Sequence, residues 1–244
     1  MTPYDISATN VSFSYRRTAD ALKDVTWQVE PGTISGLLGR NGSGKSTLAS
    51  LLAGHMRGSG ELLVGGQDPY ENREVMAGVA FVGDHPAIMW DSKLTATIDM
   101  WQATRENWSA DLAGTMLDTW GLDPTKDVPT KLSRGQQSAF FATLGVASRA
   151  PLTIFDEVHL GMDAVVRREF YDFLLEDFVR HQRTIIISSH LISEVEDLLE
   201  NVAFIHRGSI IASGNSDDIR AAHSKEGAHA SLTDILITLS KEQS

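Results

Sequence analysis

The chain has 244 residues, of which 42% are hydrophobic and 22% charged, as expected of an ordinary globular protein, and this length fits one large α/β domain or a core with an attached subdomain. It contains no cysteine, which excludes a disulfide scaffold and a cysteine-based metal or nucleophile site and suits a reducing cytosol. The net charge of −11 argues against nucleic acid as a partner, because nucleic-acid binding requires a basic face.

The sequence predicts no direct insertion into a membrane. No apolar run approaches the length of a spanning helix, and the N-terminus lacks the basic and apolar regions of a secretion signal. We therefore expect a cytoplasmic protein, whose membrane role would come through a partner.

Two segments with alternating apolar residues open the predicted fold. The alternation covers Val11, Phe13 and Tyr15 in the first and Val25, Trp27 and Val29 in the second. It predicts two half-buried antiparallel strands joined by a polar turn at residues 16–20. Further strands are expected at residues 61–64 and 79–82.

A glycine-rich segment at residues 39–46 reads G-R-N-G-S-G-K-S, which matches the phosphate-binding pattern G-x-x-x-x-G-K-S. A short apolar strand leads into it and helical spacing follows, so backbone N–H groups and a helix N-terminus converge where polyphosphate binds. Lys45 would reach the β- and γ-phosphates, and Ser46 would complete a Mg²⁺ shell. We predict a nucleoside triphosphate site at Gly39, Asn41, Gly42, Ser43, Gly44, Lys45, Ser46 and Thr47.

Residues 86–147 are predicted to form a helical region that holds four of the five tryptophans: Trp90, Trp101, Trp108 and Trp120. Such a cluster fills the core of a small helical subdomain or, as the alternative, marks a binding groove.

The second half of the chain alternates strands and helices, which predicts a parallel sheet covered by helices. Buried strands are expected at residues 152–155 and 184–188, with a helix at 164–181 between them. A second amphipathic helix would carry Leu191, Val195, Leu198 and Leu199. The tail from residue 215 onward is predicted to end in one helix with its apolar face at Leu232, Ile235, Leu236 and Leu239.

Two adjacent carboxylates, Asp156 and Glu157, end the predicted strand at 152–155. The carboxyl end of a parallel sheet is the edge where a phosphate loop lies, so Asp156 would hold Mg²⁺ and Glu157 would polarise the attacking water. The alternative is that both carboxylates only solvate a turn.

Ser133 and Gln136 form the capping-box pattern S-x-x-Q at the start of a helix. The pattern is explained by capping alone, but a helix N-terminus with a serine hydroxyl also makes a second anion site.

Together these motifs resemble the ATP-binding-cassette (ABC) ATPase family over nearly the whole chain. Residues 132–136, L-S-R-G-Q, resemble its LSGGQ signature, and residues 161–163 are similar to its D-loop. Ser188-Ser189-His190 resembles its switch histidine, and Tyr15 stands where the family carries an aromatic that stacks on adenine. Residues 207–214 follow the family's closing hairpin.

The resemblance implies one ABC domain over residues 1–244. It would combine a P-loop NTPase core, with a parallel sheet flanked by helices, an antiparallel β subdomain and an α-helical signature subdomain at about 86–147. It also implies a head-to-tail dimer with a second cassette, in which the signature of one chain contacts the ATP of the other. That signature consists of Ser133, Arg134, Gly135 and Gln136.

In the same arrangement His190 would contact the γ-phosphate within its own chain, and Asp163 would link the two sites. Each role has a structural alternative. Asp163 is a good N-cap for the following helix, His190 could be a satisfied histidine at a helix start, and Tyr15 could pack on its strand face.

The chain departs from the family at three places. Asp84 stands where a glutamine is usual, and it would either add a Mg²⁺ ligand that cannot donate a hydrogen bond or only cap a turn. Arg134 replaces the first glycine of the signature and adds a cation near the trans phosphate. Val158-His159 replace the usual Pro-Thr.

The function expected from the resemblance is that of the ATP-hydrolysing subunit of an ABC transporter, with ATP and Mg²⁺ as cofactors. It would lie on the inner face of the cell membrane and drive a separate transmembrane permease. Residues 231–236 look like a C-terminal motif of exporter-type cassettes, which favours export. The alternatives are a soluble ABC ATPase acting on ribosomes or DNA, and a regulatory cassette of low activity in a heterodimer.

Overall fold

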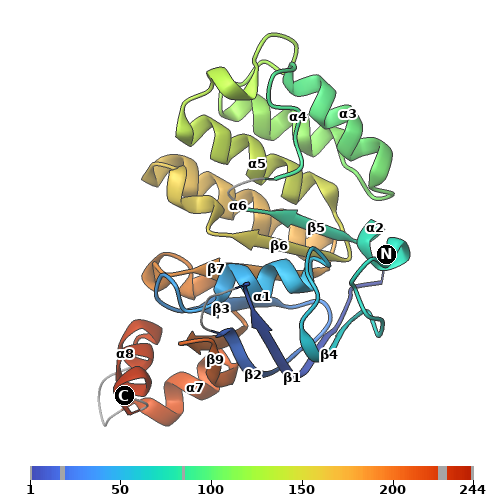
Figure 1. Cartoon of the computed structure of the whole chain (residues 1–244). Helices are drawn as coiled ribbons and strands as arrows, with labels where there is room; N and C mark the ends of the chain where they lie inside the picture. The colour runs from blue at the N-terminus through green and yellow to red at the C-terminus, as the bar shows by residue number, and fades with distance from the viewer. Residues whose placement is uncertain (1, 17–19, 84–85, 225–229, 243–244) are drawn as a thin grey trace. The chain divides into compact units, whose positions relative to one another are not determined.

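The computed structural model describes residues 2–16, 20–83, 86–224 and 230–242 (Figure 1). The chain divides into two compact units. The central unit comprises Ala77–Arg183 with Met1–Thr2, and the terminal unit comprises Pro3–Met76 with Thr184–Ser244.

The terminal unit contains a three-stranded antiparallel sheet in the order β2-β1-β4. Its strands are β1 (Ile6–Ser14), β2 (Asp20–Val29) and β4 (Ser59–Val64). The predicted pairing of the first two strands is confirmed, with Ile6 opposite Val29 and Val11 opposite Val25. Val11, Val25, Trp27 and Val29 of the alternating pattern are buried, as expected of strands with one covered face, whereas Phe13 is half-buried and Tyr15, one residue beyond β1, is exposed.

A second group of strands in this unit has the order β7-β3-β8-β9, with the first three parallel and the last antiparallel. The strands are β3 (Ile34–Leu38), β7 (Thr184–Ser189), β8 (Asn201–His206) and β9 (Ser209–Asn215). Every residue of β3 and β7 is buried, as expected of parallel strands covered on both faces. The antiparallel β8–β9 pair is the hairpin that the family resemblance implied.

The helices outside the central segment are α1 (Lys45–Leu52), the short α2 (Arg73–Ala77), α7 (Ser216–His223) and α8 (Leu232–Glu242). The tail thus contains two helices where one was predicted. Asn215 caps α7 by accepting hydrogen bonds from the backbone N–H groups of Asp217 and Asp218.

The prediction of an amphipathic helix that carries Leu191, Val195, Leu198 and Leu199 is wrong. The chain forms two single 3₁₀ turns there, η3 (Ile192–Glu194) and η4 (Glu196–Leu198). Ile192, Val195 and Leu199 are nevertheless buried. Tertiary packing therefore buries the apolar residues of this segment although the segment forms no continuous helix. Periodicity reports which residues are buried, but a segment of this length can bury them with turns.

The central unit pairs β5 (Val79–Val82) with β6 (Leu152–Asp156) in parallel. Its helices are α3 (Leu94–Thr104), α4 (Ala110–Thr119), α5 (Arg134–Ser148) and α6 (Ala164–Arg180), with 3₁₀ turns η1 (Pro129–Lys131) and η2 (Val158–Gly161). Helix α5 contacts α3, α4, α6 and both strands, and its residues from Ala139 to Ser148 are buried (Figure 1).

The tryptophans contribute to the packing of the central unit. Trp101 is 2% exposed and donates a hydrogen bond to the carbonyl of Ala87 over 2.8 Å. Trp90 packs edge-on against Phe141, and Trp120 packs edge-on against Phe173. These contacts support the core interpretation over the groove. No helix in the described part of the chain is long and apolar enough to cross a membrane.

Candidate active site

The phosphate loop of the terminal unit joins β3 to α1, as the sequence predicts. Gly42 and Gly44 have φ values of 77° and 112°, a region that favours glycine. A side chain at Gly44 would also meet the carbonyl oxygen of Ala21 at 2.8 Å, and one at Gly39 would meet the Oγ of Ser43 at 2.7 Å. The loop therefore requires glycine for both its backbone conformation and its close packing.

Lys45 lies folded against this loop. Its Nζ donates to the carbonyls of Gly39 over 2.8 Å and Arg40 over 3.2 Å, and the residue is 5% exposed. The Oγ of Ser43 is buried and has no hydrogen-bond partner among the described residues, while Ser46 is exposed at the start of α1. A held ammonium, a hydroxyl available to donate and a helix N-terminus fit an oxyanion such as polyphosphate.

The loop is held from outside by the turn between β8 and β9. The backbone N–H of Gly208 donates to the carbonyl of Ser43 over 2.9 Å, and the carbonyl of Gly208 accepts from Lys23 over 2.8 Å. The pKa of His206, the last residue of β8, is lowered mainly by burial and further by the positive charges of Arg207 and Arg40. The sequence predicted only a hairpin here. Nothing in residues 207–214 indicated that the turn supports the phosphate loop.

Tyr15 and His190 belong to the same unit as the loop. The hydroxyl of Tyr15 lies 3.3 Å from the Oγ1 of Thr47, and its ring is 46% exposed and packs edge-on against Phe13. The carbonyl of Ser189 accepts from the N–H of Gly39 over 3.3 Å, so half-buried His190 follows a residue bonded to the first loop glycine. The structure therefore brings Tyr15 to the loop and places His190 next to a residue that is bonded to it.

The central unit carries the two carboxylates. Asp156 is the last residue of β6 and is 7% exposed. Glu157 follows it with φ of 57° and ψ of 21°, a left-handed conformation that is uncommon for residues other than glycine. Such backbone strain occurs often at functional sites, and here it redirects the chain at the end of the strand.

The signature residues form the start of α5, and the predicted capping box is confirmed. The Oγ of Ser133 accepts from the N–H of Gln136 over 3.3 Å, and the Oε1 of Gln136 accepts from the N–H of Ser133 over 3.0 Å. Ser133, Arg134 and Gln136 are exposed, so this helix N-terminus remains accessible. Asp163 likewise caps α6, accepting from Val165 and Val166.

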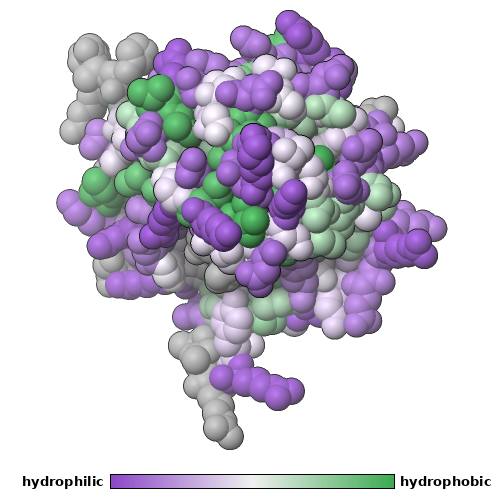
Figure 2. Space-filling model, turned by 90° about the horizontal axis from the view of Figure 1, so that it is seen from above, coloured by the Kyte–Doolittle hydropathy of each residue, from purple (hydrophilic) through white to green (hydrophobic). Residues whose placement is uncertain are grey.

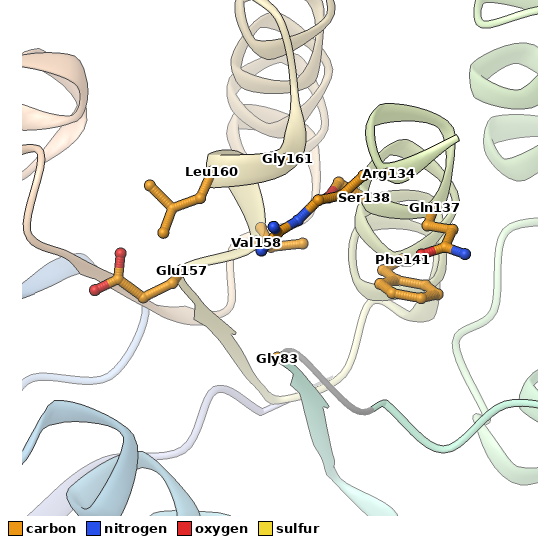
Figure 3. A pocket seen from close by; sticks show the side chains of 9 residues that line it. All are labelled: Gly83, Arg134, Gln137, Ser138, Phe141, Glu157, Val158, Leu160 and Gly161. Carbon is orange, nitrogen blue, oxygen red and sulfur yellow. The ribbon is translucent and has the colours of Figure 1, made fainter. Parts of the chain in front are cut away.

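A cavity of about 280 Å³ lies within the central unit, between the start of α5 and the turn after β6 (Figure 3). Figure 3 shows the Arg134 side chain extending from α5 toward Val158, while the carboxylate of Glu157 points away from the α5 residues. The lining residues are Gly83, Arg134, Gln137, Ser138, Phe141, Glu157, Val158, Leu160 and Gly161. The signature helix and the candidate base thus border one cavity. Asp84 lies outside the described residues.

The sequence profile of the ABC transporter family matches residues 22–159. The chain is 30% identical over 242 residues to an ABC transporter ATP-binding protein of Synechocystis sp., covering 93% of this chain and 80% of that protein. It also resembles a solved ATP-binding subunit of an ABC transporter with a TM-score of 0.83 and 23% identity, covering 96% and 98% of the two chains. The chain belongs to the ABC transporter family. Its fold is the predicted P-loop NTPase fold, and it is an ATP-binding ATPase subunit of the transporter type.

Two further relatives of similar identity are named for different transport activities. The chain is 29% identical to the ATP-dependent lipid A-core flippase of Pseudomonas fluorescens, covering 87% of this chain and 37% of that protein. It is also 29% identical to the sulfate/thiosulfate import ATP-binding protein CysA of Mesorhizobium japonicum, covering 88% and 64%.

Proposed function

We propose that two copies of this cassette, or this cassette and a related one, close on ATP in a head-to-tail dimer and drive a separate membrane permease. The single observation that carries the proposal is the division of the site. The phosphate loop is fully formed around Lys45, whereas the signature end of α5 is capped and exposed. An exposed helix N-terminus with a serine hydroxyl is a ready site for the γ-phosphate bound by the loop of another chain.

ATP would bind through the phosphate loop, with its adenine against the exposed ring of Tyr15. Lys45 would exchange its bonds to the loop carbonyls for the β- and γ-phosphates, and the loop N–H groups would bind the same oxygens. Asn41, Gly42, Ser43 and Thr47 complete the loop. The phosphate contacts would thus use donors that the loop already holds in place.

Mg²⁺ would take the hydroxyl of Ser46 and the carboxylate of Asp156, and it would supply charge neutralisation between the phosphates. Phosphate and water oxygens would complete the shell, because Mg²⁺ usually keeps several waters and binds substrate phosphates beside one or two carboxylates. Asp84 is a further candidate ligand.

Glu157 would act as the general base on the attacking water, and His190 would hold the γ-phosphate within the same chain. In trans, Ser133 and Gly135 would contact that phosphate, flanked by Arg134 and Gln136. Arg134 adds a cation beside the transferred group, which the three charged phosphate oxygens favour. Asp163 would link the two sites while it caps α6.

The permease would dock on the helical part of the central unit. Met89, just before α3, is 43% exposed. Figure 2 shows a face of the molecule on which hydrophobic residues lie among hydrophilic ones. The tail motif at residues 231–236 and the flippase relative support export, and the position of the cassette would be peripheral on the cytoplasmic face of the membrane.

The variant Glu157→Gln tests this proposal. It keeps the size of the side chain but removes the base, so we expect ATP binding and a stable ATP-dependent dimer with turnover lower by roughly 100-fold or more. Steady-state ATP hydrolysis and size-exclusion chromatography with ATP measure the two effects. Glu176→Gln, an exposed change on α6, should leave both unchanged.

The same trapped dimer identifies the partner. Purified from its native membrane, Glu157→Gln should bring with it a protein that contains spanning helices, and transport in sealed vesicles of both orientations then gives the direction. Unchanged hydrolysis would remove Glu157 as the base. Recovery of ribosomal proteins instead of a membrane protein would overturn the permease assignment.

A further inference from the structure

The segment between His190 and β8 is fastened to both helices of the C-terminal tail through one carboxylate. The Oε2 of Glu196 accepts from the Nη2 of Arg220 in α7 over 3.1 Å and from the backbone N–H of Leu232 at the start of α8, also over 3.1 Å. The side chains of Glu196 and Arg220 are 16% and 24% exposed. A charge-assisted bond with this degree of burial is stronger than a surface ion pair.

Apolar contacts follow the same path. The face of α8 formed by Leu232, Ile235 and Leu236 is buried, and α8 packs against η3 and α7. On the opposing segment Ile192 and Val195 are buried. In Figure 1, α7 and α8 lie next to each other at the end of the chain. We call Glu196, Arg220 and Leu232 the tail clamp.

The clamped segment has little regular structure of its own. It consists of the two 3₁₀ turns η3 and η4, whose hydrogen bonds have poorer geometry than those of an α-helix. Its conformation therefore depends on the elements that pack against it. The clamp secures the middle of the segment, six residues after His190, while Leu199 and Glu200 at its far end bond to Ser216 and Ile34.

The near end of the segment is secured to the phosphate loop. The Oγ of Ser189 accepts from the N–H of Leu191 over 2.9 Å, and the carbonyl of Ser189 accepts from Gly39. His190 thus lies between an anchor on the nucleotide site and an anchor on the tail.

We propose that the C-terminal helices position His190 for ATP hydrolysis through the tail clamp, with Glu196 and Arg220 as positioning residues. The inference rests on the proposed role of His190 at the γ-phosphate. With the clamp formed, the turn after β7 has one conformation and the imidazole is presented to the phosphate. With the clamp broken, the turn samples several conformations. The rate of ATP hydrolysis then falls, while the phosphate loop still binds ATP.

The test uses the full-length protein with Arg220→Ala and, separately, Glu196→Ala. We expect kcat to fall roughly tenfold in each, within the range of coupling seen between residues in contact, with little change in the affinity for a fluorescent ATP analogue. Arg57→Ala is the matched control. It breaks the ion pair in which the Nη2 of Arg57 lies 3.4 Å from the Oδ2 of Asp68 in the same unit, and it should leave kcat unchanged.

A double-mutant cycle separates positioning from a merely structural effect. If the clamp acts through His190, Arg220→Ala should cost nothing further in a His190→Ala background. A full additional tenfold loss there, or an unchanged kcat in both single variants, would overturn the proposal. If His190→Ala alone hydrolyses ATP normally, the proposed role of His190 fails, which is a distinct result.

Glu196→Gln covers the case in which the alanine variants do not fold. It keeps an acceptor oxygen for Leu232 but loses the charge opposite Arg220, so we expect a smaller fall in kcat and the same non-additivity with His190→Ala. If Glu196→Gln and His190→Ala together lower kcat by the product of their separate effects, the proposal is contradicted in the same way.

Discussion

At the scale of single residues, Asp177 joins three parts of the central unit by charge. Its Oδ1 accepts from the Nε and Nη2 of Arg149 over 3.0 and 2.6 Å, and its Oδ2 accepts from Arg183 over 2.9 Å. Arg183 is fully buried, and its pKa is lowered by that burial although the charge of Asp177 opposes the shift. One carboxylate therefore compensates two arginines, one at the end of α5 and one after α6.

Asp177→Asn should destabilise the protein by about 3 kcal/mol, because it leaves two arginines without their buried counter-ion. Urea unfolding measures this as a lower midpoint. Asp172→Asn on the same helix is the control. Its partner Arg168 is 79% exposed, so we expect a loss below about 1 kcal/mol. Equal midpoints for the two variants would show that the buried pair contributes no more than the surface pair.

At the scale of elements, the signature helix α5 and the turn η2 after β6 pack against each other through two glycines, Gly135 and Gly161. A side chain on Gly161 would overlap the Oγ of Ser138 and lie 3.1 Å from the carbonyl oxygen of Arg134. A side chain on Gly135 would lie 3.2 Å from the carbonyl oxygen of Gly161. The contact thus connects the signature end of α5 with the turn that follows Glu157.

Gly161→Ala should push η2 away from α5 and move Glu157. We expect kcat to fall roughly tenfold, with ATP affinity retained because the phosphate loop lies in the other unit. Adding Ser138→Ala removes the overlapping oxygen and should restore part of the rate. Gly114→Ala in α4, where an added side chain meets no atom within 4 Å, should change nothing. Full activity of Gly161→Ala would show that the packing does not position Glu157.

The sequence predicted elements best where local rules decide them. The phosphate loop, the cap at Ser133 and the cap at Asp163 each depend on a few consecutive residues, and each formed as predicted. The segment after His190 did not form the predicted helix. Its Glu196 is held by Arg220 and Leu232, which lie 24 and 36 residues further along the chain. Helical spacing carries no information about such distant partners. The hydrogen bond from the N–H of Gly208 to the carbonyl of Ser43 could not be predicted for the same reason.

At the scale of the whole molecule, the candidate site residues are divided between the two units. The terminal unit holds the phosphate loop with Tyr15 and His190, and the central unit holds Ser133, Glu157 and Asp163. A composite site in a head-to-tail dimer would join the loop of one chain to the signature of the other. The site would then form only when ATP brings two chains together, so binding energy would be converted into closure.

Mixing two inactive variants tests this arrangement. Lys45→Ala disables the loop and Ser133→Arg disables the signature, so each homodimer should be inactive. A mixed dimer would contain one site with the intact loop of the Ser133→Arg chain and the intact signature of the Lys45→Ala chain, and one site with both defects. We expect mixing to restore hydrolysis, measured against each variant alone at the same total concentration. A cassette that used its own signature would stay inactive after mixing, because every site would keep one defect, and that result would exclude the trans arrangement.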